Sequence, residues 1–157
     1  MKELNLVTKI RVYAYNELSE TDKNLVDEAK AATARSYSPY SRFAVGAALL
    51  LANGEVVSGS NQENVAFPSG TCAERTTCFY AHSRYPGVRF VKLAIAAHHN
   101  GAFTPRPVSP CGACRQVLAE YEKLGGAKLE VILYGDDEVW VLPEVKALLP
   151  LAFDEEL

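Results

Sequence analysis

The sequence of 157 residues contains no apolar run that approaches the length of a membrane-spanning helix, about 18 residues. It also has no Lys- or Arg-rich stretch, and its formal net charge is −3, so it lacks the basic surface that neutralises phosphates in nucleic-acid binding. Residues 1–4 include an early acid and alternate polar with apolar side chains, which is not the pattern of a signal peptide. These absences predict a cytoplasmic protein that acts on a small molecule, with neither nucleic acid nor a membrane as its partner.

Cysteine is also scarce, with four residues in the chain. Four cysteines could form two disulfides, but in a reducing compartment metal binding or catalysis is the more common role. Three of them stand in two short motifs: Cys72 in T-C-A-E-R, and Cys111 with Cys114 in P-C-G-A-C. A lone C-x-x-C is also typical of a redox pair or of half a structural zinc site, but here a third cysteine and Glu74 come before it.

We expect each motif to open a helix. Residues 76–83 contain no Pro or Gly, residues 115–124 are rich in helix-forming residues, and Pro110 marks a helix start. A helix N-terminus presents free N–H groups and a partial positive charge, which lowers the pKa of a thiol. Two such helix ends facing each other would hold three thiolates around one Zn²⁺. Three protein ligands and a water are the arrangement of a catalytic zinc site.

Glu74 gains a role in this arrangement, because a carboxylate beside a zinc-bound water can take its proton and pass it on. A glutamate two residues after the first ligand, followed later by P-C-x-x-C, is the pattern of zinc nucleobase deaminases, in which the glutamate does not bind the metal.

On these residues the chain resembles the small, three-cysteine cytidine deaminases. The similarity covers roughly residues 20–155, and four matching stretches follow one another in the family's order: residues 36–48, 61–64, 72–75 and 109–117. The resemblance implies an α/β protein with a three-layer α-β-α fold around a mixed, roughly five-stranded sheet. It also implies one Zn²⁺ per chain and a homotetramer with its sites at subunit boundaries.

We expect one domain over residues 1–157, with residues 1–18 as an N-terminal extension that contains a strand over residues 4–15. Asn53-Gly54 between two apolar runs predicts a hairpin. Helix, hairpin, helix, strand, helix and strand follow one another, which indicates a partly parallel sheet covered by helices. The expected helices span residues 21–35, 72–83, 110–124 and 143–149, and the expected strands residues 43–52, 55–60, 88–97 and 129–135.

The resemblance implies roles for four further side chains. Asn61 and Glu63 would hold the ribose 3′-hydroxyl, although a polar pair in a loop is also ordinary turn chemistry. Phe43 would lie against the pyrimidine or the sugar, where its pattern alone would place it in the core. Arg75 would donate to a ligand sulfur and restore some Lewis acidity to a zinc that carries three thiolates, or it is a solvated surface charge.

Backbone groups near Ala73 and Ser109 would read the edge of the base, again by resemblance. Phe153 resembles a residue that reaches into the neighbouring subunit's site in related tetramers, with a plain hydrophobic anchor as the alternative. Cys78 lies about 240° around the helix from Cys72, so we expect it to be a buried thiol and not a ligand. The three histidines, His82, His98 and His99, are not spaced to join the cysteines.

The implied reaction is hydrolytic deamination of cytidine and deoxycytidine, a step of pyrimidine salvage. Hydroxide on the zinc would be the nucleophile at C4, and Glu74 would carry the proton first to N3 and then to the departing amine. One rival is a deaminase of another aminopyrimidine, such as a nucleoside antibiotic. A nucleic-acid editing deaminase would typically use His as its first ligand and a basic groove, and a zinc-stapled binding module would need a fourth ligand.

Overall fold

The computed structural model describes residues 1–154, which form three α-helices and seven strands. The helices are α1 (Glu20–Ala32), α2 (Ala73–Arg84) and α3 (Gly112–Gly125). The strands are β1 (Arg11–Tyr13), β2 (Phe43–Leu51), β3 (Val56–Ser60), β4 (Phe90–His99), β5 (Ala102–Phe103), β6 (Glu130–Tyr134) and β7 (Val139–Leu142). Short 3₁₀ turns occupy Tyr15–Glu17, Thr33–Arg35, Phe67–Ser69 and Val145–Ala147.

The strands form one mixed sheet in the order β1-β7-β6-β4-β2-β3, with β5 paired to β4 outside this path. Only β4 and β6 pair in parallel, and the other pairs are antiparallel. The mixed α/β sheet is confirmed, but it has seven strands where the resemblance implied about five. The two unpredicted strands, β5 and β7, have two and four residues, and runs that short show no readable hydrophobic period.

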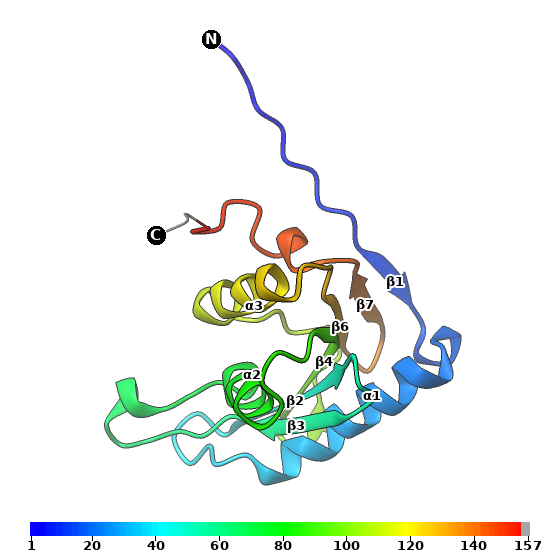
Figure 1. The fold of residues 1–157 in the computed structure, drawn as a ribbon. Coiled ribbons are helices and arrows are strands. Elements are labelled where there is room, and N and C mark those ends of the chain that lie inside the picture. Colours follow the sequence, from blue (N-terminus) through cyan, green and yellow to red (C-terminus); the bar gives the residue numbers. More distant parts are fainter. Residues whose placement is uncertain (155–157) are drawn as a thin grey trace.

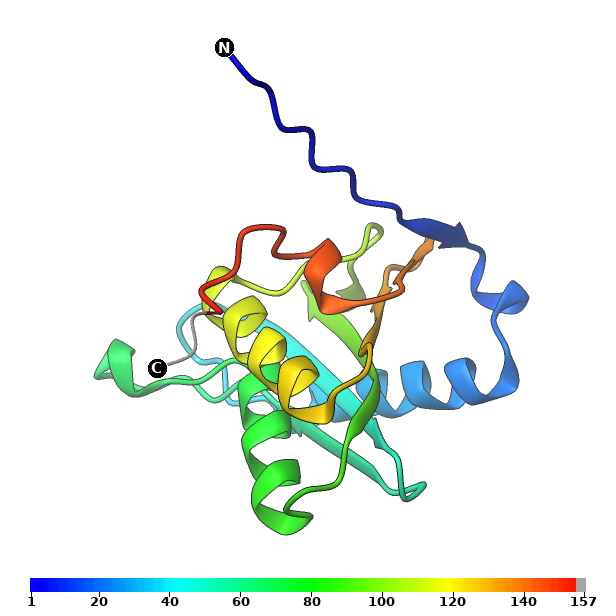
Figure 2. The same ribbon diagram turned by 45° about the horizontal axis from the view of Figure 1, so that its top comes forward.

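Helices cover both faces of the sheet and make the expected three layers (Figures 1 and 2). The amphipathic α1 buries one apolar face, which includes Leu25 and Val26, on one side of the sheet. α2 and α3 pack on the other side around a second cluster. Glycine permits the closest approaches, because a Cβ on Gly46 would meet the Ala29 carbonyl oxygen of α1 at 2.0 Å, and one on Gly59 would meet Thr77 of α2 at 2.7 Å.

The strand directions explain why the N-termini of α2 and α3 meet. β3 and β4 are both antiparallel to β2, so they run in the same direction and their carboxyl ends lie at one edge of the sheet. α2 follows β3, and α3 follows β4 and the short β5. Both helices therefore begin near this edge, which is where open α/β sheets place their ligands.

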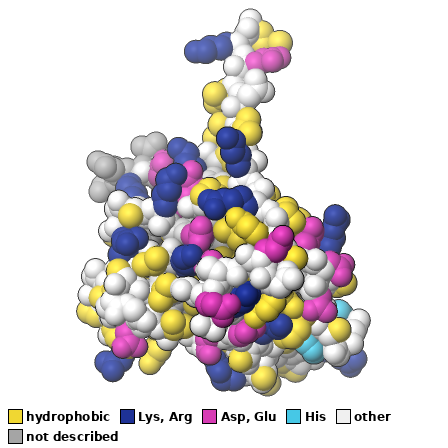
Figure 3. Space-filling view, turned by 90° about the vertical axis from the view of Figure 1, so that its right-hand side faces the viewer, with side chains coloured by type: hydrophobic (Ala, Val, Ile, Leu, Met, Phe, Trp, Pro, Cys, Tyr) yellow, Lys and Arg dark blue, Asp and Glu magenta, His cyan; other side chains and the backbone are white. Residues whose placement is uncertain are grey.

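The predicted N-terminal strand over residues 4–15 is wrong in extent, since only β1 pairs with the sheet. Its partner β7 has four residues and gives three register pairs, from Arg11 opposite Val141 to Tyr13 opposite Val139, so the preceding residues have no strand beside them. Residues 1–10 form an exposed extended arm that projects from the body (Figures 1 and 3), and the Thr8 hydroxyl joins it to the Ala147 carbonyl oxygen at 3.1 Å.

The helix predicted over residues 21–35 is confirmed as α1, which begins at Glu20 because the Ser19 hydroxyl caps it by accepting from the Asp22 amide at 3.2 Å. The helix predicted over residues 143–149 is wrong, since that stretch forms only the 3₁₀ turn Val145–Ala147. Within residues 1–154, no helix has the length and apolar character needed to cross a membrane.

Candidate metal centre and substrate site

Three cysteine thiols converge where α2 and α3 begin. Cys72 is the N-cap residue of α2, Cys111 is the N-cap residue of α3, and Cys114 lies in the first turn of α3. The Sγ atoms of Cys72 and Cys111 are 3.9 Å apart, those of Cys111 and Cys114 are 3.5 Å apart, and all three lie within 4.8 Å of one another. Both helices start where the two motifs predicted, and the two motifs meet.

This donor set fits Zn²⁺. Zn–S bonds of about 2.3 Å in a tetrahedron place the sulfur atoms about 3.8 Å apart, and the thiols already stand close to that separation. Among the described residues, no fourth His, Cys, Asp or Glu joins the cluster. Three thiolates with one open position are the donor set of a catalytic zinc site.

The surroundings of the cluster favour thiolate at Cys72. Its pKa is lowered to about 5, chiefly by a hydrogen bond from Cys114 and further by Arg75, whose Nη2 atom donates to Cys72 Sγ at 3.5 Å. The pKa of Cys114 is raised, because its thiol donates that hydrogen bond and a second negative charge beside Cys72 would be repelled. Arg75 thus contacts a proposed ligand sulfur, as the resemblance implied.

Glu74 lies in the first turn of α2, two residues after Cys72, and is only 5% exposed. Burial raises the pKa of its carboxyl, and the negative charge of Cys72 raises it further. A buried carboxyl with a raised pKa binds a proton more readily than an exposed one, which suits a general acid–base group that must take up a proton and pass it on.

The comparisons with known proteins agree with this geometry. A family model described as "Cytidine and deoxycytidylate deaminase zinc-binding region" matches residues 19–124. The chain belongs to the cytidine and deoxycytidylate deaminase family. It is 45% identical to the cytidine deaminase of Sporosarcina psychrophila, over 85% of this chain and 92% of that protein. It is 46% identical to the cytidine deaminase of Halalkalibacterium halodurans, over 84% of this chain and 93% of that one.

Solved structures of the same family share the fold. The crystal structure of the cytidine deaminase from Burkholderia pseudomallei superposes with a TM-score of 0.71 at 40% identity, over 87% of this chain and all of that one. The matched region of the family model includes Cys72, Glu74, Cys111 and Cys114, so the metal centre lies inside the part of the chain that the family shares.

Asn61 follows β3, and its side chain fastens the loop to the start of β2. Its Oδ1 atom accepts hydrogen bonds from Val45 N at 2.8 Å and Ser36 Oγ at 2.6 Å, and its Nδ2 atom donates to Phe43 O at 2.9 Å. An amide oxygen has two lone pairs and an amide nitrogen two hydrogens, so the one hydrogen-bonding position left is the second hydrogen on Nδ2. The Asn61 side chain therefore keeps one N–H donor for a further partner.

Glu63 is fixed by backbone amides from another loop. Its Oε2 atom accepts from Tyr40 N at 2.9 Å and from Ser41 N at 3.2 Å. Hydrogen bonds from the Ser41 side chain and from both amides lower the pKa of its carboxyl, so it stays ionised. Glu63 lines a cleft of about 460 Å³ that also contains Asn61 and Cys72.

The other predicted substrate contacts lie outside the lining of this cleft. Phe43 is half-buried beside His99, with ring centroids 5.6 Å apart. The Ala73 amide belongs to the first turn of α2, where N–H groups have no helical acceptor. Ser109 accepts a hydrogen bond from Arg115, and Phe153 is 66% exposed on the C-terminal segment. Of these four residues, Phe43 is joined to the cleft through its backbone, since its carbonyl oxygen accepts from Asn61 Nδ2 at 2.9 Å.

The sequence reading missed four contributors to the site. Tyr40 and Ser41 supply backbone amides, which no side-chain motif reveals. Arg115 and Gln116 follow Cys114 directly and hold the C-terminal segment, and their position inside the matching stretch of residues 109–117 was the available signal. Cys78, on α2, is fully buried in the core, where burial raises the pKa of its thiol, and it is not among the three thiols that converge.

Proposed function

We propose that this chain catalyses the zinc-dependent hydrolytic deamination of cytidine and deoxycytidine to uridine and deoxyuridine. The observation that carries the proposal is the convergence of three thiols at two helix N-termini, next to the buried Glu74 carboxyl. The names of its relatives support cytidine as the substrate class.

Cys72, Cys111 and Cys114 would hold one Zn²⁺ per chain. The metal, when bound, supplies Lewis acidity that brings the pKa of water toward neutrality. Arg75 donates a hydrogen bond to the Cys72 sulfur. This bond reduces the negative charge that the thiolate gives to the metal.

Glu74 carries the proton. Its carboxylate accepts a proton from the attacking water and donates it to N3 of the pyrimidine, which makes C4 electrophilic. The water oxygen forms the new bond to C4 and still carries its second proton. Glu74 takes this proton from the C4 hydroxyl and delivers it to the amine as the C4–N bond breaks, so that the C4 carbonyl of the uracil ring forms and ammonia leaves. Water and cytidine are consumed, and uridine and ammonia are formed. The raised pKa of Glu74 supports both directions of transfer.

The substrate is oriented by groups at the rim and at the helix ends. Glu63 has its Oε2 atom occupied by backbone amides, which leaves Oε1 to accept from the ribose 3′-hydroxyl. Asn61 donates to the same hydroxyl through its remaining amide hydrogen. Backbone groups at Ala73 and Ser109 would contact the base edge, and Phe43 would pack against the pyrimidine or the sugar.

The functional form would be a homotetramer in the cytoplasm, with Phe153 of each chain contacting the site of its neighbour. The exposure of Phe153 supports this role, since within residues 1–154 this large aromatic side chain is left 66% exposed on a segment whose backbone is held by hydrogen bonds. A reducing compartment would keep the metal-binding thiols free.

Ultraviolet absorbance of the purified protein with cytidine and with deoxycytidine tests the proposal, together with metal analysis. We expect conversion to the uracil product and one zinc per chain. A zinc-loaded protein that leaves both nucleosides unchanged would exclude the nucleoside assignment, and the same assay with other aminopyrimidines would then identify the substrate.

A further inference from the structure

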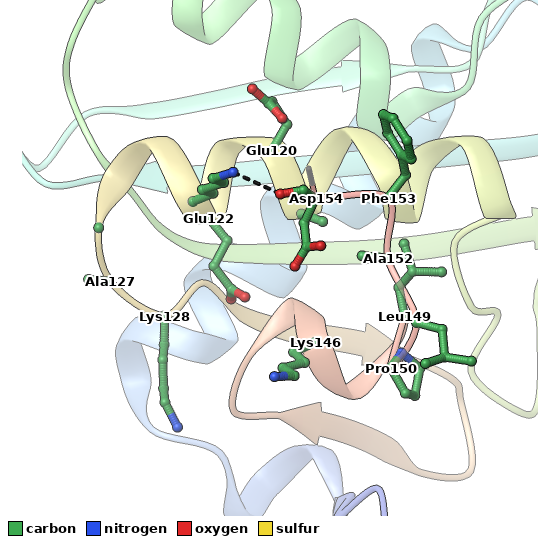
Figure 4. Close-up of a pocket in the computed structure, with 14 residues that line it drawn as sticks. Glu120, Glu122, Ala127, Lys128, Lys146, Leu149, Pro150, Ala152, Phe153 and Asp154 are labelled. Atoms are coloured by element: carbon green, nitrogen blue, oxygen red, sulfur yellow. Dashed lines mark hydrogen bonds between the residues drawn. The ribbon is translucent and has the colours of Figure 1, made fainter. Parts of the chain in front are cut away.

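The C-terminal segment of residues 148–154 lies along α3 and borders a groove of about 460 Å³ (Figure 4). In this view the Phe153 ring points away from Pro150 and Lys146, and the hydrogen bond from Lys123 reaches the backbone of Asp154. The segment after the Val145–Ala147 turn has no regular secondary structure, so its position depends on contacts made by side chains of α3.

Gln116 holds Phe153 by its backbone. The Gln116 Nε2 atom donates to Phe153 O at 2.7 Å, and Phe153 N donates to Gln116 Oε1 at 3.1 Å. One side-chain amide thus satisfies both polar groups of a single residue, as a neighbouring strand would. These two bonds fix the backbone of Phe153 and leave its ring free to project.

Arg115 connects the start of the same segment to the metal centre. Its Nη1 atom donates to Leu148 O at 3.0 Å, its Nε atom to Pro110 O at 2.8 Å, and its Nη2 atom to Ser109 Oγ at 2.9 Å. Ser109 and Pro110 directly precede the ligand Cys111. One guanidinium therefore bridges the residues before the metal ligand and the base of the C-terminal segment.

We propose that Arg115 and Gln116 are positioning residues that place Phe153 at a fixed offset from the metal centre of its own chain. Arg115 anchors the base of the segment, and Gln116 sets the Phe153 backbone. Because both side chains follow Cys114 on one rigid helix, the aromatic ring is presented in one orientation before any substrate binds. The inference rests on the proposed contact of Phe153 with a neighbouring site.

The test uses Gln116→Leu, which keeps the size of the side chain and removes both hydrogen bonds to Phe153. Glu120→Leu is the matched control, since Glu120 lies one turn further along α3 and shares none of these bonds. Hydrogen exchange of the Phe153 amide should rise about tenfold or more in Gln116→Leu and stay unchanged in Glu120→Leu. Unchanged exchange in Gln116→Leu would show that the two hydrogen bonds from Gln116 do not hold the Phe153 backbone, whatever the kinetics.

Kinetic measurements then test whether Gln116 acts on substrate binding through the proposed contact of Phe153 with the neighbouring site. We expect the KM for cytidine to rise about five- to twentyfold in both Gln116→Leu and Phe153→Ala, at constant zinc content, and no further in the double variant. Effects that multiply in the double variant would mean that Gln116 does not act through Phe153, which overturns the proposal. An unchanged KM in Phe153→Ala would contradict the contact of Phe153 with the neighbouring site. The exchange data would still report whether Gln116 holds the C-terminal segment.

Discussion

Glu74 and Glu63 border the same site in opposite environments. Glu74 is 5% exposed, and burial raises the pKa of its carboxyl. Glu63 sits at the mouth of the cleft, where hydrogen bonds from Ser41 and from two backbone amides lower its pKa. Two identical carboxyl groups thereby have different properties: Glu74 binds a proton more readily than an exposed carboxyl, and Glu63 remains an ionised hydrogen-bond acceptor.

The two regions around these carboxyls are also built differently. The metal end arises where two helices begin at one edge of the sheet, so regular secondary structure sets its geometry. The rim is made of loops that are fastened to each other by backbone pairs, such as Gln62 N to Thr71 O at 2.9 Å and Glu63 N to Tyr37 O at 2.8 Å. Substitutions at the metal end should therefore affect chemistry, and those at the rim should affect substrate binding.

Glu74→Gln should produce the largest effect. The amide keeps the shape of the side chain and cannot shuttle a proton, so we expect kcat to fall about 10³- to 10⁴-fold with little change in KM. Steady-state rates by ultraviolet absorbance measure this, with zinc analysis as the control for an intact metal centre. A variant that retains zinc and most of its kcat would contradict the assignment of Glu74 as the proton carrier.

Glu63→Gln should show the reverse pattern. An amide offers a weaker, neutral acceptor to the sugar hydroxyl and could turn its nitrogen toward the amides of Tyr40 and Ser41. We expect KM to rise about 10- to 100-fold while kcat stays within a fewfold of the wild type. Cytidine lacking its 3′-hydroxyl is the matching substrate control, because Glu63→Gln should no longer discriminate against it. A drop in kcat at unchanged KM would place Glu63 in the chemistry and erase the contrast with Glu74.

The pH dependence of kcat/KM should show that Glu63 remains ionised over the working range. The folded-state pKa of Glu63 lies below the usual 4.5, so its contribution to stability and binding is present above pH 4.5 and is lost as the pH falls through the lower, folded value. From pH 4.5 upward, Glu63→Gln should therefore have a kcat/KM profile of the same shape as the wild type, displaced downward. A change in the shape of its acid limb in that range would mean that Glu63 titrates there.

The sequence predicted the metal end more fully than the rim. Cys72, Pro110 and the C-x-x-C spacing are local signals for helix starts, and the structure has helices there. The three hydrogen bonds that occupy the Asn61 amide join residues from distant parts of the chain, and no local pattern encodes them. The length of β1 was likewise set by its partner β7, which the sequence reading had not recognised as a strand.

The same limit applies to Phe153. The family resemblance implied its contact across a subunit boundary, which stays a prediction, and the structure places the side chain in an exposed position. What holds it could not be predicted, because a glutamine on an amphipathic helix is normally a solvated surface residue. The pairing of Gln116 with both backbone groups of Phe153 depends on the path of a segment without regular structure.

The smallest effect on activity is expected from substitution of Cys78, a second cysteine at α2 that can be compared with Cys72. Cys72 caps α2 with its pKa lowered to about 5, whereas burial raises the pKa of Cys78, so only Cys72 is predisposed to the thiolate form that binds metal. Cys78→Ala should leave zinc content and kcat/KM unchanged and lower the free energy of unfolding by about 1 kcal/mol, as small losses of core packing do. Urea unfolding of the zinc-loaded protein measures this. Release of zinc from Cys78→Ala would contradict this comparison, because it would mean that the buried Cys78 also supports metal binding.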